Sequence, residues 1–287
     1  MNVLSLFDGM SCGQIALERA GIKVDNYYAS EIKPHAIKVT QHNYPKTIQL
    51  GDVTKITKEM LPKIDMVIGG SPCQDFSRGN KERLGLDGEK SGLFMQYLRI
   101  VEEVKPKFFL LENVVMDFLD RKFIDDSLNC LPVRINSNLV SAQLRDRFYW
   151  TNIGPSDTTL FRQHECLIPP PNDRGIKLKD ILTSGFVESD KSYCLNTKYN
   201  QGRSQEGIRR RRSVAMDSYV FLSPDLNDEK GLRFFNVTEL ERLQTLPENY
   251  TEILTPTQAC NCIGDGWTVD VIAHIFSFLP EEYKNAL

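Results

Sequence analysis

The stretch DMVIGGSPCQDFSRG, residues 65–79, decides the fold class of this chain. It starts as an apolar run that is typical of a buried strand, passes through two glycines, and reaches Cys73 directly after Pro72. Proline restricts the backbone, so the pattern predicts a strand that ends in a turn and holds the thiol in a fixed direction. A side chain that follows a strand in this way is a candidate for chemistry.

Short apolar runs and amphipathic segments alternate on both sides of this stretch. The expected strands are residues 2–7, 26–31, 64–70, 108–114, 132–140 and 147–153, and the expected helices are residues 12–21, 34–44 and 92–104. In the last helix, apolar residues recur at helical spacing, which indicates packing onto a core. The alternation predicts an α/β fold with a doubly wound, mostly parallel sheet that is covered by helices.

The regular pattern stops after residue 153 and returns near residue 233. We expect a catalytic domain of residues 1–153 and 233–287, and a small inserted module of residues 154–232 that is irregular in sequence. In the returning part, Thr238 with Glu241 three residues later predicts a helix that starts with a capping box. Residues 268–279 read as a buried helix.

Composition and charge argue against an overall basic protein, a membrane-spanning or secreted protein, and a protein held by disulfides or a structural metal. The chain has 35 Lys and Arg against 38 Asp and Glu, a net charge of −3, so any nucleic-acid site must be local. One basic run, residues 202–213, fits such a site, although a solvated loop is an equal alternative. The sequence shows no signal peptide or membrane span, which predicts a cytoplasmic protein. The seven scattered cysteines predict neither disulfides nor a structural metal.

Three features after the first strands suggest an adenosine-bearing cofactor. LFDGMSCG, residues 6–13, joins a strand to a helix through two glycines, which lets backbone N–H groups approach a ligand; a tight structural turn is the alternative. Glu31 follows the second strand and suits the two hydroxyls of a ribose. Asp52, in LGDVT, follows a further strand that precedes residues 64–70 and suits an exocyclic amine. Alone, each acid is more often a helix cap or a solvated loop residue.

Cys73 follows the expected strand of residues 64–70, and Glu112 lies near the end of the expected strand of residues 108–114, about one βαβ unit further on. In adjacent parallel strands these two side chains would share one cleft. A free cysteine is only a few per cent thiolate at neutral pH, so a nucleophile here needs a helix terminus, a cation or a substrate that takes up charge.

Five motifs occur in a fixed order: LFDGMSCG, GGSPCQDFS, ENV, SAQLRDRFYW and RFFNVTELERLQTLP. Together they resemble the motif series of the DNA cytosine-5 methyltransferases, and the resemblance covers nearly the whole chain apart from the insert. Within that family the motifs are most similar to the animal de novo enzymes. The segment GDGWTVDVIAHIF, residues 264–276, departs from the more usual Gly-Asn ending, which favours Trp267 as a contact of the cofactor.

The resemblance implies a class I methyltransferase fold and a reaction in duplex DNA. Cys73 would add to carbon 6 of a flipped cytosine, and Glu112 would hold the protonated ring nitrogen and accept from the exocyclic amine. Arg145 and Arg147 would line the same cleft, one supporting the base and the other a phosphate or Glu112. The alternative for this arginine pair is a surface ion pair.

The resemblance also implies the binding residues. S-adenosylmethionine would contact Phe7, Asp8, Gly9, Ser11, Cys12, Gly13, Glu31, Ile32, Asp52, Val53, Pro72, Leu93 and Trp267. Double-stranded DNA would contact Ser77, Arg78, Lys81 and Arg83 in the loop of residues 74–92, and Arg203, Arg209, Arg210, Arg211 and Arg212 in the insert. The protein would be a monomer or a homodimer, with no membrane and no metal among its partners.

Three rival functions fit the sequence less well. A transfer RNA methyltransferase of the same architecture would carry a Cys-Phe-Thr motif in the recognition region, which is not found. A catalytically silent paralogue would have lost the Pro-Cys pair or the glutamate, and both are present. A nicotinamide oxidoreductase would need a glycine fingerprint that is missing, and Cys73 would have no role.

Overall fold

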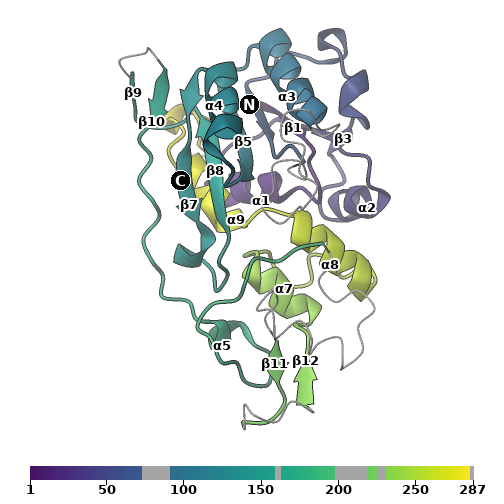
Figure 1. Cartoon of the computed structure of the whole chain (residues 1–287). Helices are drawn as coiled ribbons and strands as arrows, with labels where there is room; N and C mark the ends of the chain where they lie inside the picture. The colour runs from purple at the N-terminus through teal and green to yellow at the C-terminus, as the bar shows by residue number, and fades with distance from the viewer. Residues whose placement is uncertain (73–90, 159–162, 198–218, 225–230, 285–287) are drawn as a thin grey trace. The chain divides into compact units, whose positions relative to one another are not determined.

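The computed structural model describes residues 1–72, 91–158, 163–197, 219–224 and 231–284 (Figure 1). The chain forms two compact units. Unit 1 comprises Met1–Ile135, Asp146–Pro170 and Ile272–Leu287, and unit 2 comprises Asn136–Arg145 and Pro171–Val271. The expected functional division, with a recognition insert of residues 154–232, stays a prediction.

A sheet dominates unit 1. Among the described residues it has seven strands in the order β3-β2-β1-β4-β5-β8-β7. Their bounds are β1 Asn2–Leu6, β2 Asn26–Ser30, β3 Ile48–Gln49, β4 Met66–Gly69, β5 Phe108–Val114, β7 Val133–Asn136 and β8 Asp146–Thr151. The first five pair in parallel, whereas β8 runs antiparallel to β5. The prediction of a mostly parallel sheet is therefore confirmed.

One expected strand is shorter than predicted. Residues 132–140 form β7 only as far as Asn136, and Ser137–Leu139 turn into a short 3-10 helix. The Asn136 side chain accepts a hydrogen bond from the Asn138 N–H at 3.1 Å, which caps that helix and ends the strand.

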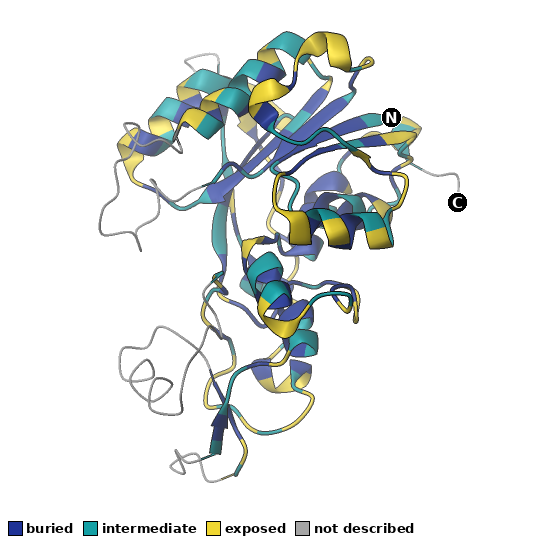
Figure 2. Cartoon of the chain, turned by 90° about the vertical axis from the view of Figure 1, so that its right-hand side faces the viewer, coloured by how far each residue is buried: buried dark blue, intermediate teal, exposed yellow. Residues whose placement is uncertain are grey.

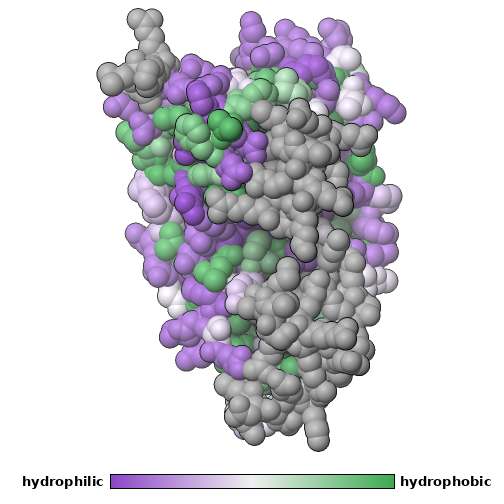
Figure 3. All heavy atoms as spheres, viewed as in Figure 1, coloured by the Kyte–Doolittle hydropathy of each residue, from purple (hydrophilic) through white to green (hydrophobic). Residues whose placement is uncertain are grey.

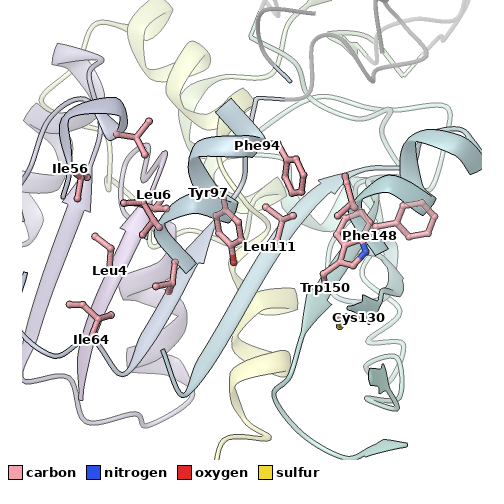
Figure 4. Close-up of a cluster of buried hydrophobic side chains, with 14 of the residues drawn as sticks. Leu4, Leu6, Ile56, Ile64, Phe94, Tyr97, Leu111, Cys130, Phe148 and Trp150 are labelled. Carbon is pink, nitrogen blue, oxygen red and sulfur yellow. The ribbon is translucent and has the colours of Figure 1, made fainter. Parts of the chain in front are cut away.

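Helices lie on both sides of the sheet (Figure 2). Their bounds are α1 Cys12–Arg19, α2 Pro34–Asn43, α3 Ser91–Val104 and α4 Phe118–Leu128. The apolar stripe of α3 packs as predicted at Phe94 and Tyr97, which join the core cluster with no exposed surface (Figure 4). Ile100, which was not part of the predicted stripe, is buried in the same cluster. In the same cluster, Trp150 of β8 donates its indole N–H to Asp125 at 2.7 Å.

The remaining elements are short. They are β6 Cys130–Leu131, β9 Ser156–Thr158, β10 His164–Cys166, α5 Leu178–Ile181, β11 Val220–Phe221, β12 Leu232–Arg233, α7 Val237–Leu243, α8 Pro256–Asp265 and α9 Val269–Phe276. The predicted burial of α9 is confirmed, since Val271, Ile272, Ile275 and Phe276 have no exposed surface.

The predicted cap of α7 is wrong. The cap is Asn236, whose side chain accepts from the Glu239 N–H at 2.9 Å while Glu239 accepts from the Asn236 N–H at 2.9 Å. Thr238 lies inside the first turn. Glu241 is buried and instead accepts from the N–H groups of Asn249 and Thr251.

On the face shown in Figure 3, hydrophilic side chains predominate among the described residues, and hydrophobic ones lie in groups between them. The most exposed large apolar residues are Leu119, Ile32 and Phe118. None of the helices in the described parts of the chain has the length and apolar character that crossing a membrane requires.

Candidate functional site

The turn between β1 and α1 has an unusual backbone. Phe7, Gly9 and Ser11 all have positive φ, at 57°, 60° and 61°. Positive φ costs a non-glycine residue about 1–3 kcal/mol and tends to occur at functional sites. A Cβ added to Gly9 would meet no atom within 4 Å, so this turn borders open space that a ligand could fill. Cys12 and Gly13 follow as the buried start of α1.

The side chain of Asp8 stabilises this turn through hydrogen bonds. Its carboxylate accepts from the Tyr27 hydroxyl at 2.8 Å and from the Ser11 hydroxyl, and Ser11 also lies 3.0 Å from the Thr40 hydroxyl. Burial raises the pKa of Asp8 to about 6, with a smaller contribution from the charge of Glu31, against the lowering effect of the hydroxyl hydrogen bonds. The Asp8 network therefore fixes the shape of the turn.

Glu31, which directly follows β2, holds the same turn through hydrogen bonds. One carboxylate oxygen accepts from the Gly9 N–H at 2.8 Å, and the other accepts from the N–H groups of Ile32 and Lys33 at 2.7 and 2.8 Å. A carboxylate has about four acceptor positions, and three are used here. Glu31 can therefore accept one hydroxyl of a ribose while it holds the glycine turn.

The other residues predicted to bind the cofactor differ in exposure. Ile32 is 69% exposed, as a ligand contact would be, whereas Val53 is 5% exposed and belongs to the core cluster. Asp52 caps the 3-10 helix Val53–Lys55, and hydrogen bonds from the N–H and hydroxyl of Thr54 lower its pKa. Leu93 packs partly buried against the core.

The ends of β4 and β5 lie side by side. Gly69 pairs with Leu111, and the Asn113 amide donates to the Ser71 hydroxyl at 3.2 Å in a buried hydrogen bond. A Cβ on Gly69 would lie 2.8 Å from the backbone oxygen of Leu6, which explains the glycine at this position. Pro72 is half-buried and is the last residue described before the segment that contains Cys73.

Glu112 and Arg147 come together at this edge of the sheet. The Arg147 Nε donates to the Glu112 carboxylate at 2.9 Å, and the two side chains are 14% and 11% exposed. The antiparallel register places Arg147 opposite Val114, on the same face of the sheet as the pair formed by Glu112 and Tyr149. A nearly buried carboxylate that is oriented by a guanidinium can accept a hydrogen bond from a ligand.

Arg145 belongs to unit 2 and is bound differently. Its guanidinium donates to the carbonyl of Gly266 at 2.9 Å and lies 3.4 Å from the carbonyl of Leu195. Trp267 is half-buried between Gly266 and Thr268, which are both buried. Arg145 is thus a structural support of the segment that carries Trp267.

Several predicted site residues lie outside the described residues: Cys73, Ser77, Arg78, Lys81, Arg83, Arg203, Arg209, Arg210, Arg211 and Arg212. Within the described ranges, no cluster of His, Cys, Asp or Glu is arranged to hold a metal ion.

Three residues that contribute to the site were not predicted from the sequence. Ser71 and Asn113 lie inside the motifs GGSPCQDFS and ENV, so the sequence could have indicated both residues. Only the hydrogen bond between them could not be predicted. Tyr27 gave no signal, because a tyrosine in a strand is ordinary and its contact with Asp8 depends on the fold.

Comparisons with known proteins agree with this geometry. Residues 1–122 match a family model described as C-5 cytosine-specific DNA methylase. An orphan methyltransferase of Bacillus phage SPR is 40% identical over 268 residues, which is 88% of this chain and 57% of the phage protein. A type II methyltransferase of Lactococcus lactis subsp. cremoris is 28% identical over 99% of this chain and 79% of its own length. The chain thus spans little more than half the length of the phage relative.

Solved structures show the same fold at low identity. The S. pombe Dnmt2 methyltransferase superposes with a TM-score of 0.72 at 19% identity, over 97% of this chain and 98% of that one. The Entamoeba histolytica methyltransferase EhMeth gives a TM-score of 0.69 at 18% identity, over 99% of each chain. At these identities the likeness supports the class I methyltransferase fold. The expected similarity to animal de novo enzymes stays a prediction.

Proposed function

Because this chain belongs to the C-5 cytosine-specific DNA methylase family, we propose that it transfers a methyl group to carbon 5 of cytosine in double-stranded DNA. The observation that carries the proposal is the Glu112–Arg147 pair beside the end of β4. Glu112 directly follows Leu111, which pairs with Gly69 of β4, so its carboxylate is a fixed hydrogen-bond acceptor beside the end of β4. Cys73 comes four residues after Gly69 in the chain.

The proposed chemistry needs a nucleophile and a partner for the base. The Cys73 thiolate adds to carbon 6 of the cytosine, and the electron pair of the 5,6 double bond moves toward carbon 5. Glu112 accepts from the exocyclic amine and keeps the ring nitrogen protonated, which offsets the charge that the addition creates. After methylation, loss of the carbon 5 proton to a base expels the thiolate and restores the double bond.

The residues present fit S-adenosylmethionine. Glu31 retains one acceptor position for a ribose hydroxyl, Ile32 is exposed, and the turn at Gly9 borders open space. When bound, the cofactor supplies an electrophilic methyl group. The contributions of Phe7, Leu93 and Trp267 are part of this proposal.

DNA binding is proposed for two basic segments. A base inside a duplex must be flipped out before it can be methylated, which costs a few kcal/mol of unstacking. We assign phosphate contacts to Arg78, Lys81 and Arg83. Ser77 would fill the space that the flipped base leaves in the duplex. The arginines within residues 203–212 would contact bases or phosphates. Replacement of Arg209, Arg210, Arg211 and Arg212 by alanine should weaken DNA binding and reduce its salt dependence. Unchanged affinity across salt concentrations contradicts this assignment.

The setting of the reaction is inferred from the relatives. The phage and bacterial origin of the reported relatives supports action in a bacterial cytoplasm, on a phage or host genome. A type II name among them is consistent with a restriction-modification system.

The test is methyl transfer from labelled S-adenosylmethionine to mixed-sequence duplex DNA. We expect labelled 5-methylcytosine with the native protein and none with Cys73→Ser. A matched control is Cys262→Ser, which changes a half-buried thiol of α8. Transfer to RNA but not to DNA, or no transfer to either, contradicts the proposal.

A further inference from the structure

The side chain of Gln244 makes every hydrogen bond that an amide can make. Its NH₂ group donates to the carbonyls of Ile263 and Gly266 at 3.0 and 3.1 Å. Its oxygen accepts from the Gln143 amide at 3.2 Å and from the Thr268 hydroxyl at 2.9 Å. Gln244 has no exposed surface, and two donors with two acceptor positions are the full capacity of a glutamine.

These bonds fix the backbone on both sides of Trp267. The Gly266 carbonyl precedes the tryptophan, the Thr268 hydroxyl follows it, and the Val269 N–H donates to the main-chain oxygen of Gln244 at 3.0 Å. Trp267 itself is half-buried. Its indole therefore projects from a segment whose backbone has little freedom to shift.

The same network includes the segment that leads into Arg145. Gln143 donates to Gln244 and to the Leu243 carbonyl, and it accepts from the Leu195 N–H at 2.9 Å. Arg145 donates to the Gly266 carbonyl at 2.9 Å. Gln244 thus joins residues 143–145 to residues 263–269 inside unit 2.

Each partner of the Gln244 amide also has a second hydrogen bond. Gly266 retains Arg145, Ile263 retains the Gly266 N–H at 3.1 Å, Thr268 retains the Ser137 hydroxyl at 2.9 Å, and Gln143 retains the Leu243 carbonyl at 3.1 Å. Removal of the amide therefore leaves both carbonyls bonded, whereas one N–H of Gln143 and the hydroxyl hydrogen of Thr268 lose their acceptor. Burial of unsatisfied groups is the main cost of a lost hydrogen bond, so this amide contributes to stability as well as to position.

We propose that Gln244 is a positioning residue for cofactor binding, because its amide holds Gly266 and Thr268 and thereby sets the place of the Trp267 indole. The proposal rests on the proposed function, in which Trp267 contacts S-adenosylmethionine. It differs from a role in folding, because it requires the effect of Gln244 to pass through Trp267.

The test uses Gln244→Met, Trp267→Ala and the double variant in the full chain. Methionine has a similar length and no amide, so the core stays filled. We expect Gln244→Met to bind S-adenosylhomocysteine about tenfold more weakly, as the loss of fixed positioning predicts. In the Trp267→Ala background, the same change should have little further effect, because the residue through which it acts is absent.

Tryptophan fluorescence gives a second readout. The chain has two tryptophans, and Trp150 has no exposed surface, so acrylamide should quench mainly Trp267. Gln244→Met should increase this quenching. Gln258→Met is the matched control, because it removes an amide in the first turn of α8 that accepts from the Thr255 N–H. The control should change neither affinity nor quenching.

The outcomes separate the two proposals. Native protein that neither binds S-adenosylhomocysteine nor methylates DNA contradicts the proposed function and this inference with it. Native protein that does both, with unchanged affinity in Gln244→Met or fully additive effects in the double variant, overturns the positioning role alone. A variant that fails to fold also overturns it, because stability would then be the main contribution.

Discussion

Glu31 and Glu112 are two nearly buried glutamates at strands of the same sheet, yet they are bound in opposite ways. Glu31 accepts from three backbone N–H groups, which it holds in place around the glycine turn. Glu112 is itself held, by the guanidinium of Arg147 at 2.9 Å. A carboxylate that accepts from several backbone N–H groups fixes the conformation of the turn. One that is oriented by a cation can act on a substrate, so the two sites should respond differently to the loss of charge.

The largest effect is expected at Glu112. Glu112→Gln keeps an oxygen that can accept from Arg147 but removes the charge that stabilises the protonated base. We expect kcat to fall about 1000-fold, within the usual range for a lost acid–base group, while the affinity for S-adenosylhomocysteine changes less than about twofold. Single-turnover methylation and calorimetry measure the two quantities.

Glu103→Gln is the control for this variant. Glu103 pairs with Arg99 on α3 at 3.1 Å and is 37% exposed, so its replacement should change kcat by less than about twofold. Equal losses in the two variants, or a loss of cofactor affinity in Glu112→Gln, would remove the contrast between the two glutamates.

The second effect concerns the shape of the turn and depends on pH. The pKa of Asp8 in the folded protein is about 6, above its ordinary value of 3.8, so the folded state binds this proton more tightly than the unfolded state. Its contribution to stability is complete below pH 3.8 and is lost as the pH rises through 6. We expect the free energy of unfolding to fall by up to about 3 kcal/mol over this range, at about 1.4 kcal/mol per pKa unit.

Asp8→Asn isolates this contribution, because asparagine resembles the neutral carboxyl and does not titrate. Part of Asp8 reaches the surface, so the full value is an upper bound. The comparison is urea unfolding of both proteins at pH 4, 6 and 7.5. Parallel pH profiles would contradict a role for the Asp8 proton.

The third effect tests whether Arg147 acts through Glu112. Arg147→Lys keeps the charge but loses the planar guanidinium, so we expect kcat to fall about 30-fold. In the Glu112→Gln background, the same change should cost much less. Arg134→Lys is the control, since Arg134 pairs with Asp146 and is 58% exposed. Additive losses would assign Arg147 a role that is independent of Glu112.

Much of the fold was predictable from the sequence because its signals are local. The apolar runs at β1, β4 and β5 and the spacing of Phe94 and Tyr97 in α3 depend only on neighbouring residues. The end of β7 and the cap of α7 were placed wrongly. Asn136 and Asn236 bind nearby backbone N–H groups there, and sequence alone does not decide which of several polar residues does so.

The sequence singles out candidate site residues, but not the hydrogen bonds that connect them. The place of Glu31 after a strand and the motifs around Glu112 and Arg147 pointed to these residues. The contacts of Asp8 with Tyr27 and of Gln244 with Thr268 instead join positions distant in sequence. Such contacts depend on register and packing, so single positions carry no sign of them. For Arg145 the resemblance implies a place beside the base, which stays a prediction, and the structure adds that its guanidinium donates to the Gly266 carbonyl within unit 2.

The smallest effect is expected at Glu31, and it decides whether the comparison of the two glutamates holds. In Glu31→Gln, an amide NH₂ replaces one carboxylate oxygen and faces either the Gly9 N–H or those of Ile32 and Lys33, so a donor meets a donor. The turn loosens and a ribose acceptor is lost, and we expect S-adenosylhomocysteine to bind about tenfold more weakly. At saturating cofactor, kcat should change less than about threefold, because Glu31 does not touch the base. Glu59→Gln, on the exposed 3-10 helix Lys58–Met60, should leave both quantities unchanged. A large loss of kcat at saturation would show that the glycine turn also governs the chemical step, and the division between a shaping and a reacting carboxylate would then fail.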